Sequence, residues 1–388
     1  MSAQKGIGRK IQVGIAKEST RGTAPSSATY WNPWTDLTLD EKKEFVVDDQ
    51  SYGVVEDAVN LSQTKKWAEG SIAGNVHDQS IGLILYAMFG GYAVTGSNPY
   101  THTFTVGQSA QHQSLAFYLH DPLAAQDYNY PNGVVEKLEL TAELKKFIMF
   151  NASIKALTGA THADYTPSTT SENRFLPQYL AAKFALDYAG LQGTKTATGT
   201  CSTSTHVTSL SISTSTLRVG MTVTGTNIPA GTTIAAIVND TAFDLSAAST
   251  GSATSYTFGP ATIALKSAKV SISSNVEDQE VLGSTSPADF LNKEFSVEGT
   301  FEAIWKGESD FKTQFMGPTP LSIRLDFLNS DVSNSELYID LPKCTIQELG
   351  RPFKVKDLVY QEIKFKAVYS VSDTLLAKAV LTNTTSTY

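Results

Sequence analysis

The sequence has little cysteine, with Cys201 and Cys344 the two in 388 residues. Because these cysteines lie in segments that we assign to different domains, we expect no disulfide framework. Two such cysteines are consistent with folding in a reducing cytoplasm. Long apolar runs are also missing, and none approaches the roughly twenty residues that span a bilayer. The basic segment 1–10 is not followed by the apolar core of a signal peptide. We therefore expect neither membrane insertion nor export.

Positive charge is scarce as well. Thirty lysines and arginines stand against 38 aspartates and glutamates, for a formal net charge of −8. Proteins that hold nucleic acid regardless of its sequence need a basic surface that neutralises phosphates. We therefore expect that double-stranded DNA meeting this protein is repelled and not specifically bound.

Signatures of catalysis are missing too. The chain has no Gly-Lys-Ser/Thr phosphate loop, no Gly-x-Ser-x-Gly elbow and no Cys-x-x-Cys pair, and its six histidines lack metal-ligand spacing. His77-Asp78 and His120-Asp121 resemble acid-base pairs, but adjacent strand residues point apart and both pairs fall at predicted turns or caps. The polar stretch 329–336 lacks the glycine and distal glutamate of a calcium loop. We predict no enzyme activity, no catalytic residue, no metal and no cofactor.

A stretch that occurs twice organises the chain. Residues 68–90 and 297–317 each contain Glu-Gly, then a polar segment, then an apolar run closed by glycine. In the second copy an apolar set alternates with a polar, acidic one, which predicts a two-faced strand: Phe295, Val297, Phe301 and Ala303 against Glu294, Ser296, Glu298 and Glu302. The candidate helix caps are Asp78, Ser309, Gly90 and Gly317. The spacing therefore predicts a repeated strand-helix unit.

The segments after each copy also match. Strands are predicted at 115–119 and 321–325, and long hairpins at 134–157 and 344–369. The predicted fold is mainly β, with two tandem sandwich-like or barrel-like domains that each carry one short helix.

Two flanking segments have a character of their own. Residues 1–35 hold Tyr30, Trp31 and Trp34, which need a surface to pack on: either a neighbouring subunit, if the segment is a flexible arm, or the chain's own core. Residues 36–56 are rich in acid, which usually marks a solvated loop. The functional alternative is a protruding acidic loop that contacts a partner.

Residues 193–258 differ from the rest, because threonine, serine, alanine and glycine dominate and charge is rare. Short β-prone runs occur at 206–212, 221–225, 233–238 and 243–245, separated by turn formers. They predict an all-β module inserted at a hairpin tip, where an insertion least disturbs the host core. The motif at 217–234 resembles small decorative β modules of bacteriophage structural proteins.

In ordered combination these features resemble the major tail tube protein of a long-tailed, siphovirus-like bacteriophage, and also type VI secretion tubes. The insert and the duplication favour the phage. The resulting domains are an N-terminal arm (1–35), a first tube domain (36–178), a second tube domain (179–192 and 259–380), the inserted module (193–258) and a C-terminal tail (381–388).

The resemblance implies a virion structural protein, assembled in the host cytoplasm, that polymerises into stacked rings through which the genome passes. Its partners would be further copies of itself, other tail proteins such as tape measure and terminator, and double-stranded DNA that passes without specific binding. Because each chain supplies two domains, three chains would fill six places in a pseudo-hexameric ring. Differences between the copies, such as Gly74 against Ala303 and Val76 against Trp305, would create two interface types.

Residue roles follow from this resemblance as expectations. The strands expected to close the ring carry Glu69, Gly70, Ile72, Glu298, Gly299 and Phe301. The loop expected between rings carries Asp36, Asp40, Glu41, Asp48 and Asp49. The candidates for the lumen are Glu294, Glu298 and Glu302, whereas Lys364 and Lys366 would suit a lumen poorly.

Other classes remain open. A head-tail connector or capsid-decoration protein would share the insert but form a closed assembly without stacking. A surface adhesin would be expected to carry an export signal. A carbohydrate-active enzyme would need two carboxylates converging in a cleft, and the sequence does not place Glu298 and Glu302 across one.

Overall fold

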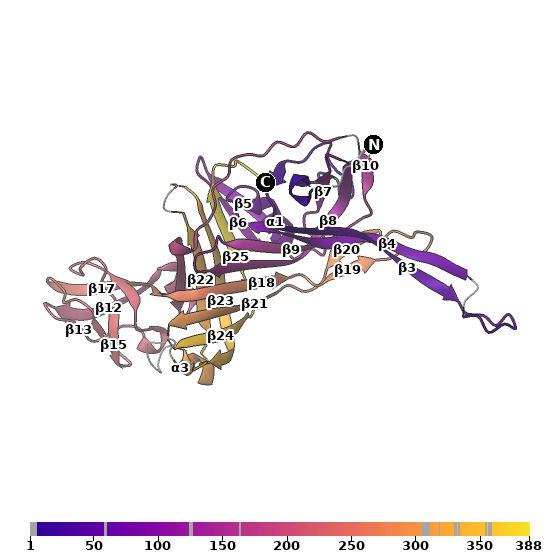
Figure 1. Ribbon diagram of the computed structural model, residues 1–388. Helices are drawn as coiled ribbons and strands as arrows, with labels where there is room; N and C mark the ends of the chain where they lie inside the picture. The colour runs from indigo at the N-terminus through magenta and orange to yellow at the C-terminus, as the bar shows by residue number, and fades with distance from the viewer. Residues whose placement is uncertain are drawn as a thin grey trace.

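A computed structural model describes residues 6–57, 60–123, 127–162, 164–304, 311–317, 319–329, 332, 334–353, 355 and 359–388. The fold is mainly β, as predicted, and its main sheet network is antiparallel. Figure 1 shows a body with a two-stranded arm at one end and a small β module at the other.

A continuous antiparallel sheet, which we call the central sheet, runs through both halves of the chain. Each of its strands is hydrogen-bonded to the next in a fixed order. That order is β3 (Asp36–Asp48), β4 (Asn60–Asn75), β9 (Met149–Ala156), β8 (Asp127–Glu143), β18 (Leu265–Ser273), β21 (Ser296–Ile304), β24 (Tyr360–Ala367) and β23 (Glu336–Gly350).

The first four strands and the last four are two copies of one unit. Glu69 of β4 lies opposite Lys155 of β9, and Glu298 of β21 lies opposite Lys366 of β24. A bulge interrupts β8 between Val135 and Lys137, and a bulge interrupts β23 at the matching place, between Ile346 and Glu348. Because a bulge alters strand direction at one defined point, a shared bulge marks a shared backbone path. The repeat seen in the sequence is therefore a repeat of topology.

Further strands complete each copy. The sets are β1 (Gln12–Lys17), β2 (Tyr30–Asn32), β7 (Leu115–His120) and β10 (Ala160–His162) in the first, and β11 (Leu180–Ala185), the end of β17 (Ser252–Ile263), β22 (Leu321–Leu328) and β25 (Lys378–Asn383) in the second. A bulge recurs between Leu115 and Phe117 in β7 and between Leu321 and Ile323 in β22. Apolar side chains of these strands share one core with one face of the central sheet.

The N-terminal segment folds onto the chain's own core. Strand β1 pairs with β2 and β7 just as β11 pairs with β17 and β22. Tyr30 and Trp31 are buried, and the Trp34 indole N–H donates to the Ile11 carbonyl at 2.9 Å. Of the two alternatives for residues 1–35, packing on its own core is the one that the described residues 6–35 adopt.

Helix α1 (Ile81–Phe89) is buried on nearly every side and ends at Gly90, whose φ of 80° suits glycine. The predicted cap Asp78 is wrong, because its carboxylate accepts from the Asn173 amide instead. Glu172 takes that place, accepting the amides of Gln79 and Ser80 at 3.1 and 2.7 Å.

The other two helices are short. Helix α3 (Lys312–Met316) is followed by Gly317 as predicted, whereas the predicted cap Ser309 lies outside the described residues. Helix α2 (Tyr188–Gln192) was not predicted, and Asp187 caps it by accepting the Gly190 amide at 2.8 Å.

The inserted module is all-β, as predicted. It contains β12 (Lys195–Ser202), β13 (His206–Val207), β14 (Met221–Thr224), β15 (Ile234–Asn239), β16 (Ala242–Leu245) and most of β17. The module core also takes in Ala185 and Leu191 of the host. In addition, the Arg218 guanidinium lies 4.6 Å from the centre of the Phe311 ring, so the module is docked on the second copy.

The acidic stretch is not the solvated loop that composition predicted. Residues from Asp36 to Asp48 form β3, which pairs along its length with β4. Cross-strand hydrogen bonding outweighs the weak strand propensity of charged residues here, because β4 offers a continuous partner. Asp49 follows the strand at the tip of the resulting hairpin.

Candidate assembly surface

The central sheet has two unlike faces. Side chains such as Ala68, Ile72, Ile154, Val270 and Phe301 point into the core and are at most 2% exposed. The alternate positions point to the opposite face and are mostly polar, as the period of two requires. We call this second side the polar face.

Charges on the polar face are largely paired. The Glu139 carboxylate contacts Lys137 at 2.7 Å and Lys269 at 3.0 Å. Burial alone would raise the pKa of Glu139, but its hydrogen bonds and charge attraction with these lysines outweigh burial and lower the pKa. Glu298 likewise contacts Lys366 at 2.9 Å. The polar face therefore carries both signs of charge in close contact.

The two copies meet within the chain where β8 pairs with β18, which we call the internal junction. Seven residue pairs form it, from Lys137 opposite Ser273 to Glu143 opposite Ser267. On the core side Leu138 packs opposite Ile272, and both are buried. Burial of such a pair stabilises by about 2 kcal/mol per side chain.

A hairpin reinforces the internal junction on the core side. It consists of β5 (Gly90–Gly96) and β6 (Tyr100–Val106), and β6 of the first copy pairs with β25 of the second. Phe104 of β6 is fully buried, and its ring lies near those of Tyr92 and Tyr388. In the second copy the connection after α3 is only residues 317–320, so this hairpin belongs to the first copy alone.

A second hairpin ties the copies together over the polar face. It comprises β19 (Val276–Gln279) and β20 (Asp289–Asn292) of the second copy. Asp289 contacts Arg21 at 2.6 Å, and Asp278 contacts Lys65 and Lys155 of the first copy at 2.7 and 3.0 Å. Burial would raise the pKa of both aspartates, but hydrogen bonds from these partners lower it.

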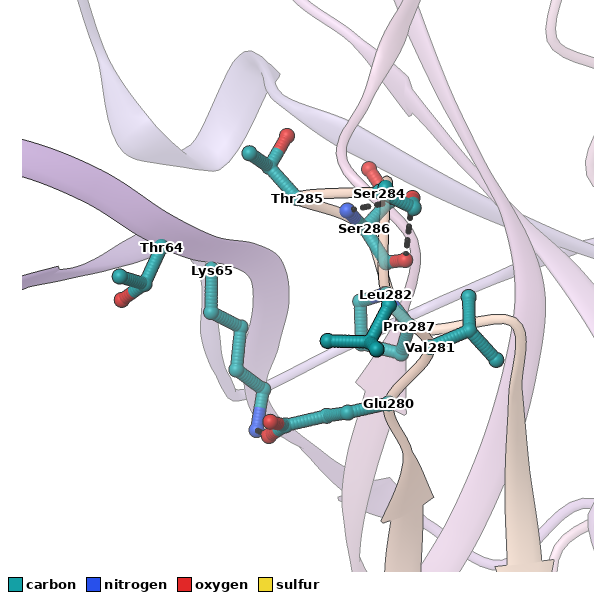
Figure 2. A pocket seen from close by; sticks show the side chains of 10 residues that line it. Thr64, Lys65, Glu280, Val281, Leu282, Ser284, Thr285, Ser286 and Pro287 are labelled. Atoms are coloured by element: carbon teal, nitrogen blue, oxygen red, sulfur yellow. Dashed lines mark hydrogen bonds and ion pairs between the residues drawn. The ribbon is translucent and has the colours of Figure 1, made fainter.

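The loop between β19 and β20 and residues Thr64 and Lys65 of β4 line an open pocket of about 290 Å³ (Figure 2). Lys65 reaches across to Glu280 at 2.7 Å, and the Lys66 amide donates to the Thr285 carbonyl at 2.7 Å. Leu282 on this loop is fully exposed. These contacts brace the base of the β3–β4 hairpin.

Beyond that base, the β3–β4 hairpin extends away from the body as a two-stranded arm (Figure 1). It exposes apolar side chains, with Phe45 55% exposed, Val47 48% and Leu61 60%. Val47 pairs directly opposite Leu61, and Phe45 lies two residues away on the same face. A bare two-stranded ribbon with an apolar stripe is marginal in water, so this arm is suited to a partner.

The predicted ring-closing residues lie inside the central sheet. Glu69, Gly70 and Ile72 are on β4, which pairs with β3 on one side and β9 on the other. Glu298, Gly299 and Phe301 are on β21, which pairs with β18 and β24. Both edges of these strands are occupied within the chain, so the outer edges of the central sheet belong to β3 and β23. Sequence alternation identified the strands but carried no signal of their order.

The other predicted residues divide between faces and segments. Asp36, Asp40, Glu41 and Asp48 lie on β3, with Asp49 at the tip. Glu298 and Glu302 project from the polar face of β21, whereas Glu294 lies in the segment before that strand. Lys364 and Lys366 share this face, where they contact Glu348 and Glu298.

In the described part of the chain, no cluster of three or more histidine, cysteine or acidic side chains is arranged to hold a metal ion. No helix among those same residues has the length and apolar character needed to cross a membrane.

The model of the phage tail tube protein family matches residues 8–367. The chain belongs to the phage tail tube protein family. No curated protein matches its sequence. A tail tube protein is a structural component of the virion tail that assembles with copies of itself and with other tail proteins.

Proposed function

We propose that this chain forms rings of three copies that stack into the tail tube, a conduit for the genome. The observation that carries the proposal is the central sheet, in which two copies of one unit are already joined edge to edge. Among the described residues, each outer strand of the central sheet has an edge with no strand beside it. On β3 this is the side away from β4, and on β23 it is the side of residues 347–350 away from β24. Exposed edges of this kind pair readily with another chain.

Stoichiometry follows from the duplication. Each chain supplies two equivalent units, so a pseudo-sixfold ring needs three chains. Closure of the sheet then removes every open edge, as in a barrel. Strands β4 and β21 would lie at equivalent radii. Residue differences such as Gly74 against Ala303 would make the junctions alternate, whereas Trp305 lies outside the described residues.

The lumen would be lined by the polar face, because the core covers the other side of the sheet. Glu298 and Glu302 would face it, but neighbouring lysines would face it as well, with Lys366 paired to Glu298 and Lys266 to Glu302. Paired charges leave few free cations for phosphates, so DNA would pass without specific binding.

The arm would contact the next ring. Strands β3 and β4 continue past the end of β9, where Ala68 is the last β4 residue paired with it. The arm therefore leaves the sheet at its rim, along the strand direction, which is where another ring of this chain would stack. Burial of its exposed apolar stripe would favour this contact. Tape measure and terminator proteins would meet the tube at its inside and its end, and assembly would take place in the host cytoplasm.

Electron microscopy of the purified protein tests this proposal. We expect stacked tubes whose cross-sections show three chains and six similar densities. Closed assemblies that do not stack would favour a head-tail connector or capsid-decoration protein. Six chains per ring, or β4 and β21 at clearly different radii, would overturn the duplication argument.

A further inference from the structure

We propose that the free edge of β23 in one chain pairs with β3 of the next chain in the register of the internal junction, so that Glu348 faces Lys42. This inference rests on ring formation as proposed above. It names the partner as a second copy of this chain and specifies which residues meet.

The register of the internal junction can be applied to β23 and β3 because the shared bulges align the strands of the two copies. Matching the bulge in β8 to the bulge in β23 makes Lys137 equivalent to Glu348. Matching Glu69 to Glu298 also makes Ser273 of β18 equivalent to Lys42 of β3. The β21 partner of Ser273 lies as far before Glu298 as the β4 partner of Lys42 lies before Glu69. Lys137 lies opposite Ser273 in the internal junction.

The side of β23 that this pairing requires is the correct one. In the first copy β7 and β18 follow one another along one edge of β8, at 128–133 and 137–143. In the second copy β22 occupies β23 up to Cys344, the residue equivalent to Gly133. Residues 347–350 are thus the part of β23 that corresponds to the segment of β8 held by β18.

The facing side chains suit each other on the polar face. In the internal junction Glu139 bridges Lys137 on its own strand and Lys269 across the junction. We call the proposed pairing of β23 with β3 of the next chain the external junction. There Glu348 already contacts Lys364 of its own sheet at 2.6 Å and would meet Lys42 across the junction. Each junction would then hold one glutamate between two lysines.

The external junction is the weaker of the two. Its ladder covers three pairs before Arg351 and Pro352, namely Glu348, Leu349 and Gly350 opposite Lys42, Glu41 and Asp40. The internal ladder covers seven pairs. On the core side Leu349 would meet Glu41, where the internal junction has Leu138 against Ile272. The β5–β6 hairpin also has no counterpart at this position, so rings should open between chains.

Disulfide trapping tests the register. Directly opposed strand residues have Cα atoms about 4.5–5.5 Å apart, within reach of a disulfide. The double variant Lys42→Cys, Glu348→Cys should give covalent dimers and trimers after oxidation of assembled tubes, with the trimer as the largest species. The native Cys201 and Cys344 are buried and should not contribute. The shifted pair Asp40→Cys, Glu348→Cys is the matched control and should cross-link at least tenfold less.

Charge reversal adds a second readout. Lys42→Glu or Glu348→Lys alone should raise the protein concentration needed for assembly about two- to fivefold, as for an exposed ion pair. The double reversal should recover part of this loss, because the introduced lysine still lies beside Lys364. Tubes that form normally but cross-link equally in the shifted pair, or not at all, would overturn this register and leave the proposed function standing. Absence of rings or tubes in the unmodified protein would overturn the proposed function itself.

Discussion

The two copies of the tube unit differ in their connections more than in their strands. Four strands of the central sheet and two bulges are common to both. The link after β1 is short, whereas the link after β11 holds the module. Strands β3 and β4 run on together as the arm, whereas the chain after β18 bends at Asn275, with φ of 45°, and folds back as β19–β20. The strands shared by the two copies therefore carry connections that give each copy different contacts.

These connections would make the internal junction unlike the proposed contact between chains. The β5–β6 and β19–β20 hairpins both cross from one copy to the other. They tie the two copies together within one chain, so in the proposed ring each chain would enter as a pair of joined units.

The largest expected effect comes from breaking the hairpin that the second copy lacks. Phe104→Ala removes a fully buried ring beside Tyr92 and Tyr388. We expect a loss of about 3–5 kcal/mol in the free energy of unfolding, because the vacated space cannot collapse fully. Denaturant titration measures it. Val94→Ala on the neighbouring strand β5 is the control, since Val94 is 38% exposed and should cost under about 1 kcal/mol; equal losses would contradict the argument.

The next effect concerns the ion pair between copies and its dependence on pH. Asp289 has a lowered pKa, so its contribution to stability is complete above the unfolded value of about 4 and is lost as pH falls through the folded pKa. Asp289→Ala should cost about 2–4 kcal/mol at pH 7, since it removes the carboxylate that balances the charge of the partly buried Arg21. Melting curves at pH 7 and pH 3 should show a smaller pH difference in the variant than in the parent protein. An unchanged difference would mean that Asp289 does not contribute to the acid sensitivity.

A smaller effect is expected where the module docks. Deleting residues 193–258 and joining the ends with a short Gly-Ser turn should leave tube formation intact, because the module lies at the end of the body opposite the arm (Figure 1). It should nevertheless lower stability, since Ala185 and Leu191 lose their cover. Arg218→Ala isolates the contact with Phe311 and should cost about 1–2 kcal/mol. A folded deletion variant that no longer assembles would show that the module is part of the tube.

Sequence periodicity predicted the strands and the repeat because each strand of the central sheet has one buried face. Phe301 and Val297 alternate with Glu298 and Thr300, and that pattern appears in the structure unchanged. Strand order could not be predicted in this way, since β8 pairs with β18 through contacts about 130 residues apart. Which strands have a free edge depends on that order, and the residues that we expected to close the ring lie on interior strands.

The arm shows a different reason for a missed prediction. Its strand carries Asp36, Asp40, Glu41 and Asp48, a composition typical of loops. The signal for a strand was the apolar trio Phe45, Val46 and Val47, which faces no core of its own chain. Because these apolar side chains are exposed in the single chain, the alternation of buried and exposed positions that marks the other strands is missing here.

The smallest effect on the fold, and the most selective effect on assembly, is expected at the arm. Phe45→Ser with Val47→Ser removes apolar side chains that are about half exposed, so the stability of the single chain should change by less than about 1 kcal/mol. Rings should still close, because the proposed β23–β3 pairing ends at Lys42. Stacking should weaken, giving shorter tubes and more single rings in electron micrographs. Reversing Asp48 and Asp49 to lysine tests the contribution of charge in the same arm. If the apolar stripe drives stacking, this charge variant should shorten the tubes less than the double serine variant does, and chiefly at low salt. Tubes of normal length in both variants would place the contact between rings on another surface and leave the arm to bind a different tail protein.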